Sequence, residues 1–367
     1  MIRVLQVMGG LNRGGAETMV MNFYKSMDLN EIQFDFITHD QEKMDYKDEI
    51  EKMGGKVYIF PKFKGYNIVT YRNTWKNFLK NHPEYKILHS HLRSYASIYF
   101  PIAKKYGLKT IIHSHSTSNG SGFESIVKYL LQKPLAKQAD YLFACSKEAG
   151  EWLYGSDRIN NDNYYLVKNS IDVNKYRYNE KIREEYRDKL NIHKNTVYGH
   201  VGRLSYPKNH KFLLKVFKDI VQNNEDAILL IIGDGELKDD IRSKIDELSL
   251  EDKVFMLGSR DDINCLLQAL DFYLFPSLWE GLPVSVIEAQ ASGLQCLISD
   301  TITSEVRLTP YIKYLPIDKG TNIWMKEAIY ADKKRFPEAA DLVIKSGYDI
   351  STTANWLTKF YRGLCND

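Results

Sequence analysis

Short runs of β-forming residues alternate with amphipathic helical patterns along most of this chain. Such alternation is typical of βαβ units, which build a parallel sheet with helices on both faces, so we expect an α/β fold. The expected strands lie at residues 3–7, 33–38, 56–60, 87–89, 110–113, 141–144, 197–201, 227–232, 254–257, 272–275 and 296–298. The expected helices include residues 16–26, 69–80, 97–105 and 125–137.

The alternation is interrupted by a highly charged stretch that ends at Leu190, and it restarts at Thr196. A chain of 367 residues is long enough for two domains, each with its own core. We expect a Rossmann-like domain over residues 1–170 and a second over 171–350, followed by a helix over 351–367 that packs back on the first domain. Two doubly wound domains in series would face a central cleft at the carboxyl edges of their sheets.

The composition narrows the class of protein. Apolar residues make up 44% of the chain and charged residues 26%, close to the globular average, which excludes a disordered or collagen-like chain. The four cysteines stand far apart, so neither a disulfide framework nor a zinc site is indicated. The N-terminus lacks the apolar core of a signal peptide, and no apolar run approaches the ~20 residues of a membrane span. We expect a cytoplasmic protein.

Between Gly54 and Pro83 the chain has no acidic residue, and basic residues are interspersed with aromatic ones. This pattern in residues 56–80 predicts a peripheral contact with the anionic inner face of a membrane. The alternative interpretation is the ordinary solvated face of an amphipathic helix.

A glycine-rich loop follows the first expected strand and opens directly onto a helix. Its glycines Gly14 and Gly15 allow the backbone to approach a ligand, and the free N–H groups of a helix N-terminus attract a phosphate. The spacing matches neither the dinucleotide pattern G-x-G-x-x-G nor the P-loop, which disfavours a nicotinamide oxidoreductase. A purely structural tight turn is the alternative.

The first strand of the second domain ends in a loop with two cations, Arg203 and Lys208. A guanidinium can bind phosphate oxygens in a bidentate way and an ammonium adds a point charge, so the pair could neutralise a diphosphate in place of a divalent metal. Surface cations are common, however, and two solvated side chains are an equally good interpretation.

The strongest signal is the segment from Phe275 to Glu288, in which Glu280 and Glu288 are separated by seven residues that begin with Gly-Leu-Pro. Pro283 suits the first turn of a helix, so Glu280 should lie in the preceding loop and Glu288 about a turn and a half inside the helix. Carboxylates accept hydrogen bonds from hydroxyl groups, which suits sugars and riboses. Two glutamates on a solvated face are the alternative.

Two H-x-H pairs end strands of the first domain: His89 with His91, and His113 with His115. They could suggest a metal, but no carboxylate ligand follows at a sensible spacing and no D-x-D occurs, so we expect metal independence. For each of these histidines a structural imidazole is as good an interpretation as a catalytic one.

In the order and spacing of these motifs the chain resembles the retaining GT-B glycosyltransferases of family 4, and overall it is most similar to their bacterial branch for capsule and exopolysaccharide synthesis. The resemblance implies that His115, Arg203, Lys208 and Glu280 are catalytic, with His113 as the alternative register for His115. It implies a nucleotide-sugar site that consists of Gly14, Gly15, Arg203, Lys208, Glu280, Gly281, Leu282, Pro283 and Glu288, with Glu288 on the ribose and Glu280 on the donor sugar.

The activity implied is transfer of a hexose or N-acetylhexosamine from a nucleotide sugar, UDP-linked, to a hydroxyl of a glycan or lipid-linked acceptor, with retained configuration. No metal, no other cofactor and no nucleic acid is expected. The alternatives are a nucleotide-sugar epimerase of the same fold and a non-catalytic nucleotide-sugar-binding protein.

Overall fold

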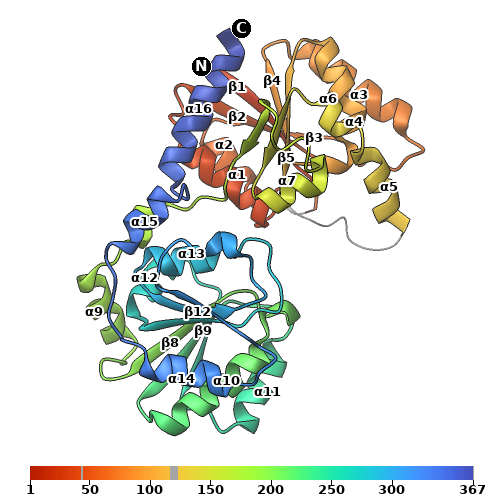
Figure 1. Ribbon diagram of the computed structural model, residues 1–367. Helices are drawn as coiled ribbons and strands as arrows, with labels where there is room; N and C mark the ends of the chain where they lie inside the picture. Colours follow the sequence, from red (N-terminus) through yellow and green to blue (C-terminus); the bar gives the residue numbers. More distant parts are fainter. Residues whose placement is uncertain (43, 116–122, 367) are drawn as a thin grey trace. The chain divides into compact units, whose positions relative to one another are not determined.

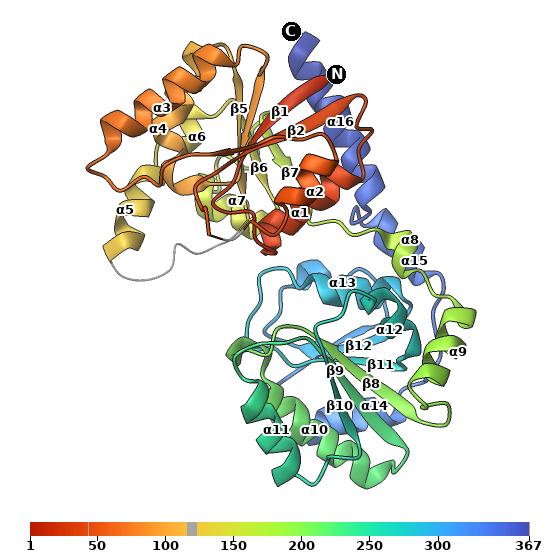
Figure 2. The same cartoon turned by 180° about the vertical axis from the view of Figure 1, so that it is seen from behind.

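The computed structural model describes residues 1–42, 44–115 and 123–366, and the chain divides into two compact units. Unit 1 contains residues Met1–Ser170 together with the C-terminal segment that begins at Ile350, and unit 2 contains Ile171–Asp349. Each unit is an α/β domain with one parallel sheet (Figures 1 and 2), so the expected fold class of two Rossmann-like domains is confirmed.

Unit 1 has a seven-stranded sheet in the order β3-β2-β1-β4-β5-β6-β7. Every residue of β2 is buried, as expected for a strand covered on both faces. The strands are β1 (Ile2–Val7), β2 (Ile32–Thr38), β3 (Val57–Ile59), β4 (Ile87–Ser90), β5 (Lys109–Ser114), β6 (Tyr141–Ala144) and β7 (Tyr164–Leu166). The helices are α1 (Gly15–Lys25), α2 (Lys47–Lys52), α3 (Ile68–Asn81), α4 (Arg93–Lys105), α5 (Phe123–Gln132), α6 (Leu135–Gln138), α7 (Lys147–Tyr154) and α16 (Ile350–Asn366).

The last helix of the chain, α16, belongs to unit 1. Together with α1 and α2 it covers one face of the sheet, while α3, α4 and α6 cover the other (Figure 1). Leu357 and Tyr361 of α16 are buried, and the Tyr361 ring packs edge-on against Phe34 of β2. The C-terminal aromatic residues therefore complete the core of the N-terminal sheet.

Unit 2 has a six-stranded sheet in the order β10-β9-β8-β11-β12-β13. Helices α12 and α13 cover one face, and α10, α11 and α14 the other. The strands are β8 (Thr196–Val201), β9 (Ala227–Ile232), β10 (Val254–Gly258), β11 (Phe272–Phe275), β12 (Gln295–Ser299) and β13 (Ile312–Leu315). The helices are α8 (Val173–Tyr176), α9 (Glu180–Lys189), η1 (Tyr206–Lys208), α10 (His210–Asn223), α11 (Lys238–Glu247), α12 (Ile263–Ala269), α13 (Val284–Ala291), η2 (Ser304–Val306), α14 (Asn322–Tyr330) and α15 (Ala339–Lys345).

Two local expectations differ from the structure. The helix expected over residues 125–137 is two helices, α5 and α6, because Pro134 caps the second one and lacks the N–H that a continuous helix would need. The edge strands β7 and β13 were not expected, because three or four residues give too short an alternation to recognise. Among the described residues no helix combines the length and apolar character required to cross a membrane.

Candidate active site

Two loops of unit 2 leave the carboxyl ends of neighbouring strands. One follows β8 and carries Lys208, and the other follows β11 and carries Glu280. The loops are joined by two hydrogen bonds: Leu278 N–H donates to the Pro207 carbonyl at 2.8 Å, and the Asn209 Nδ2 amide donates to the Pro276 carbonyl at 3.1 Å. These two bonds hold the loops against each other.

Lys208 and Glu280 form an ion pair at the centre of this site. Lys208 Nζ lies 2.6 Å from Glu280 Oε1, and the two side chains are only 16% and 17% exposed. The ammonium also lies 4.7 Å from the centre of the Phe275 ring, within the range of a cation–π contact. Because water is largely excluded from this pair, its charges act more strongly than they would on an open surface.

Two glycines, Gly202 and Gly233, allow the Lys208 side chain and its loop to pack closely against the neighbouring backbone. A Cβ atom on Gly202 would lie 3.0 Å from Lys208 Cε, so the lysine stem lies directly over the Gly202 backbone. Gly233 has a φ of +142°, and a Cβ there would overlap the Gly202 carbonyl. Side chains at either position would displace the loop that carries Lys208.

Arg203 lies in the same loop but is not part of the ion pair. Its side chain is 73% exposed, and its Nε donates to Glu236 Oε2 at 3.1 Å. An exposed pair of this kind contributes little to stability, so the guanidinium is available to an anion. Among the described contacts, none joins Arg203 to Lys208 or Glu280.

Glu288 lies in the fifth position of α13, and Pro283 immediately precedes that helix instead of occupying its first turn. The Tyr176 hydroxyl donates a hydrogen bond to Glu288 Oε1 at 2.7 Å. Burial raises the pKa of the Glu288 carboxyl to about 7, while the hydrogen bond from Tyr176 and the charge of Lys175 oppose this shift. Tyr176 was missed by sequence reasoning, because no motif links residues 112 positions apart.

The turn before α13 contains the other expected donor-site residues. Gly281 is exposed, and a Cβ there would meet no atom within 4 Å, so the space beside its backbone is open. Leu282 is partly buried and packs on the core below α13, and Pro283 is buried.

In unit 1, Gly14 caps helix α1 and Gly15 is its first residue. No side chain caps this helix through a hydrogen bond to its N–H groups, as an anion site requires. The Glu17 carboxylate, however, lies directly over Gly14, and burial raises the pKa of Glu17. A phosphate at this position would therefore compete with a carboxylate of the same helix.

The two H-x-H pairs come together in unit 1, because β4 and β5 are neighbours in the sheet. The rings of His89 and His113 lie 5.4 Å apart, and those of His113 and His115 lie 4.1 Å apart. His113 is completely buried, whereas His115 is partly exposed. Of the two registers, only His115 reaches the surface of the unit.

The basic and aromatic stretch of residues 56–80 separates into two faces. Phe60, Tyr71 and Trp75 are buried in the core of unit 1, whereas Tyr66, Val69 and all the basic residues are exposed. The aromatic side chains of this stretch are thus mostly structural. The exposed basic residues are Lys56, Lys62, Lys64, Arg72, Lys76 and Lys80.

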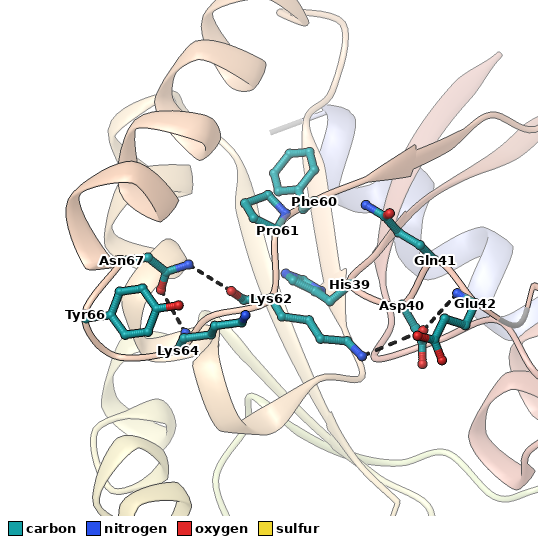
Figure 3. Close-up of a pocket in the computed structure, with 10 residues that line it drawn as sticks. All are labelled: His39, Asp40, Gln41, Glu42, Phe60, Pro61, Lys62, Lys64, Tyr66 and Asn67. Atoms are coloured by element: carbon teal, nitrogen blue, oxygen red, sulfur yellow. Dashed lines mark hydrogen bonds and ion pairs between the residues drawn. The ribbon is translucent and has the colours of Figure 1, made fainter.

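A pocket of about 420 Å³ lies beside this stretch, where the chain leaves β2 and β3 (Figure 3). Asp40, Gln41 and Glu42 line one side, and Lys64, Tyr66 and Asn67 line the other. Lys62 extends between the two sides, with Nζ 3.8 Å from Asp40 Oδ1. The mixture of hydroxyl-binding polar groups and an exposed aromatic ring is a suitable lining for a saccharide.

Comparison with known proteins gives a consistent result. The family model "Glycosyltransferase Family 4" matches residues 13–175, and "Glycosyl transferases group 1" matches residues 182–308. EpsF of Bacillus subtilis, assigned as a glycosyltransferase, is 31% identical over 98% of this chain and 96% of its own length. The Staphylococcus aureus capsular polysaccharide biosynthesis glycosyltransferase CapH is 24% identical over 85% of each chain.

One relative has a defined reaction in its name. The Escherichia coli UDP-Gal:α-D-GlcNAc-diphosphoundecaprenol α-1,3-galactosyltransferase is 30% identical over 59% of this chain and 58% of its own length. Among solved structures, Anabaena HepE in complex with UDP superposes with a TM-score of 0.79 at 17% identity, covering 99% of this chain and 100% of that one. At this level of identity the structural likeness concerns the fold.

Proposed function

Because the chain belongs to the family 4-type GT-B glycosyltransferases of polysaccharide biosynthesis, we propose that it transfers a hexose or N-acetylhexosamine from a UDP-sugar to a glycan or lipid-linked acceptor, with retained anomeric configuration. The observation that carries the proposal is the sheltered Lys208–Glu280 pair at the carboxyl end of the unit 2 sheet. Ligands of doubly wound sheets bind at this edge.

In the proposed mechanism Lys208 and Arg203 stabilise the departing diphosphate. As the glycosidic bond lengthens, negative charge grows on the leaving group, and fixed cations stabilise the transition state more than the ground state. The departing phosphate accepts the proton of the attacking hydroxyl on the face that it vacates. Fixed cations take the place of a divalent metal in this scheme, which supports a metal-independent reaction.

Glu280 and Glu288 bind the two ends of the donor. Glu280 accepts a hydrogen bond from a hydroxyl of the donor sugar, while Lys208 turns to the diphosphate. Glu288, held by Tyr176, accepts hydrogen bonds from the ribose hydroxyls. The backbone at Gly281 and Leu282 contacts the sugar, and Pro283 starts the helix that presents Glu288.

Unit 1 supplies the acceptor half in this proposal. His115 lies near the reacting sugar, Gly14 and Gly15 lie beside the distal phosphate, and the pocket in Figure 3 takes part of the acceptor glycan. A lipid-linked acceptor is supported by the E. coli relative, whose named acceptor is a diphosphoundecaprenol-linked sugar. The exposed basic residues of 56–80, with Tyr66 and Val69, would contact the anionic membrane that carries such an acceptor.

The test is a panel of UDP-sugars offered with a diphosphate-linked GlcNAc acceptor, with product linkage determined by NMR. The proposal predicts an acceptor-dependent α-linked product from one donor of the panel. An isomerised UDP-sugar formed without any acceptor would instead identify an epimerase. Donor binding without hydrolysis, transfer or isomerisation, under conditions where a relative is active, would identify a non-catalytic binding protein.

A further inference from the structure

The histidine cluster of unit 1 extends to a glutamine of the neighbouring strand. Gln6 of β1 pairs in register with His89 of β4. Alternate residues of a strand share one face, so Gln6, His89 and His113 lie on the sheet face that α16 covers. His91 and His115 directly follow β4 and β5, and their rings lie 5.0 Å apart. At this place in the core, polar side chains stand where aliphatic side chains would otherwise pack.

The hydrogen bonds of this cluster have a definite direction. The Gln6 side chain presents its carbonyl oxygen Oε1, and not its amide nitrogen, to His91. His91 Nε2 lies 2.9 Å from that Oε1, and since a carbonyl oxygen can only accept, His91 must carry its proton on Nε2. A neutral imidazole has one proton, so His91 Nδ1 is an acceptor.

The same reasoning gives the position of the proton on His115. His115 Nε2 lies 2.7 Å from His91 Nδ1, so it must donate to that acceptor, and the proton of His115 is on Nε2. His115 Nδ1 is then a free lone pair, and it has no hydrogen-bond partner among the residues that the structure describes. Burial, with the charge of Arg93, lowers the pKa of His115 to about 3, so that the ring is neutral at pH 7.

We propose that Gln6 and His91 are positioning residues that fix the proton of His115 on Nε2 and thereby leave Nδ1 as a hydrogen-bond acceptor for a hydroxyl group of the bound sugar. The sugar contact rests on the role of His115 proposed above, whereas the direction of the chain rests on the structure of unit 1 alone. A buried hydrogen-bond acceptor without a donor costs free energy, and a hydroxyl of the ligand that donates to His115 Nδ1 would remove this cost.

A bound metal ion is the competing explanation of the cluster. One ring nitrogen each of His89, His91 and His113 lies within 4.8 Å of the others. Both nitrogens of His91 are already engaged, however, by Gln6 and by His115. Only His89 and His113 retain unpartnered nitrogens among these three, which is fewer than the three protein ligands usual for zinc.

The first experiment is NMR of the full-length, ligand-free protein labelled with ¹⁵N-histidine, with resonances assigned through His91→Asn and His115→Asn. The proposal predicts a protonated Nε2 and an unprotonated Nδ1 for both His91 and His115. The Nε2 proton of His115 should persist in His91→Asn, whose side-chain oxygen can accept it, and be lost to exchange in His91→Leu. A proton on His115 Nδ1 would overturn the proposal, and so would one equivalent of tightly bound zinc in the isolated protein.

The second experiment measures turnover. His91→Leu should lower kcat by ~10-fold, the effect of losing one hydrogen bond of the supporting chain, with the KM for the donor changed less than ~3-fold. His91→Asn should restore most of the loss. His82→Leu is the control, because His82 is a histidine of unit 1 outside this cluster, paired with Glu84, and it should retain kcat.

Equal kcat values for His91→Leu and the wild type, or for His91→Leu and His91→Asn, would contradict the positioning role. If the wild-type protein transferred no sugar from any donor, the proposed function would fail, and the NMR result would still decide the direction of the chain.

Discussion

Replacing Lys208 by methionine tests the charge at the centre of the candidate site. The substitution keeps most of the side-chain length and removes the ammonium that lies 2.6 Å from Glu280 Oε1 in a setting only 16% exposed. A unit charge ~4 Å from a phosphate oxygen contributes about 4 kcal/mol at an effective dielectric constant of ~20. Part of this is offset by the attraction of Glu280, so we expect kcat to fall by ~10²-fold, or about 2.7 kcal/mol.

The assay is single-turnover transfer with saturating UDP-sugar, accompanied by calorimetric titration with UDP. Lys208→Met should weaken UDP binding as well as slow transfer, whereas Glu280→Gln should weaken binding of the UDP-sugar more than that of UDP. Lys215→Met, on the exposed side of α10, is the control and should behave as the wild type. Transfer by Lys208→Met within ~3-fold of the wild-type rate would refute the role assigned to this cation.

Three other perturbations probe separate parts of the molecule. The pKa of Glu288 is about 7, and the ribose hydroxyls need its ionised carboxylate as acceptor, so the affinity for the UDP-sugar should be ~10-fold higher at pH 8 than at pH 6. Titration calorimetry should show this pH dependence of the affinity, and Glu288→Gln should abolish it. Asp271→Ala leaves Arg183 and Arg187 without their buried partner, at 2.5 and 3.2 Å, and should lower the free energy of unfolding by about 3–5 kcal/mol in urea denaturation; a loss below ~1 kcal/mol would show that the pairs are unimportant. Replacing Lys62, Lys64, Arg72 and Lys76 by glutamate should abolish sedimentation of the protein with anionic vesicles, whereas the same charge reversal at four exposed lysines of unit 2 should not. An unchanged bound fraction would exclude these residues as the membrane contact.

The fold was predictable because buried parallel strands leave a strong pattern. Every residue of β9 is buried, and in the sequence this strand is a short, wholly apolar run between helices. Pro134, which separates helices α5 and α6, is also visible in the sequence, but the helical spacing of apolar residues continues across it. Periodicity alone therefore joined two helices that the proline separates.

The site was predictable only in part. That Lys208 and Glu280 follow strands placed both at the carboxyl edge of a sheet, but their contact depends on β8 and β11 being neighbours, which no local pattern encodes. The same holds for Tyr176 beside Glu288 and for the link of His91 to Gln6, whose partners are distant in sequence. Such pairings arise from tertiary packing, and the sequence alone carries no spacing rule for them.

The central claim is that the loops after β8 and β11 hold the donor. The most direct measurement is a crystal structure of the protein soaked with UDP. The account predicts the diphosphate on Lys208 and Arg203, and the ribose hydroxyls on Glu288. A nucleotide bound elsewhere on the chain, with the Lys208–Glu280 pair intact and untouched, would contradict it.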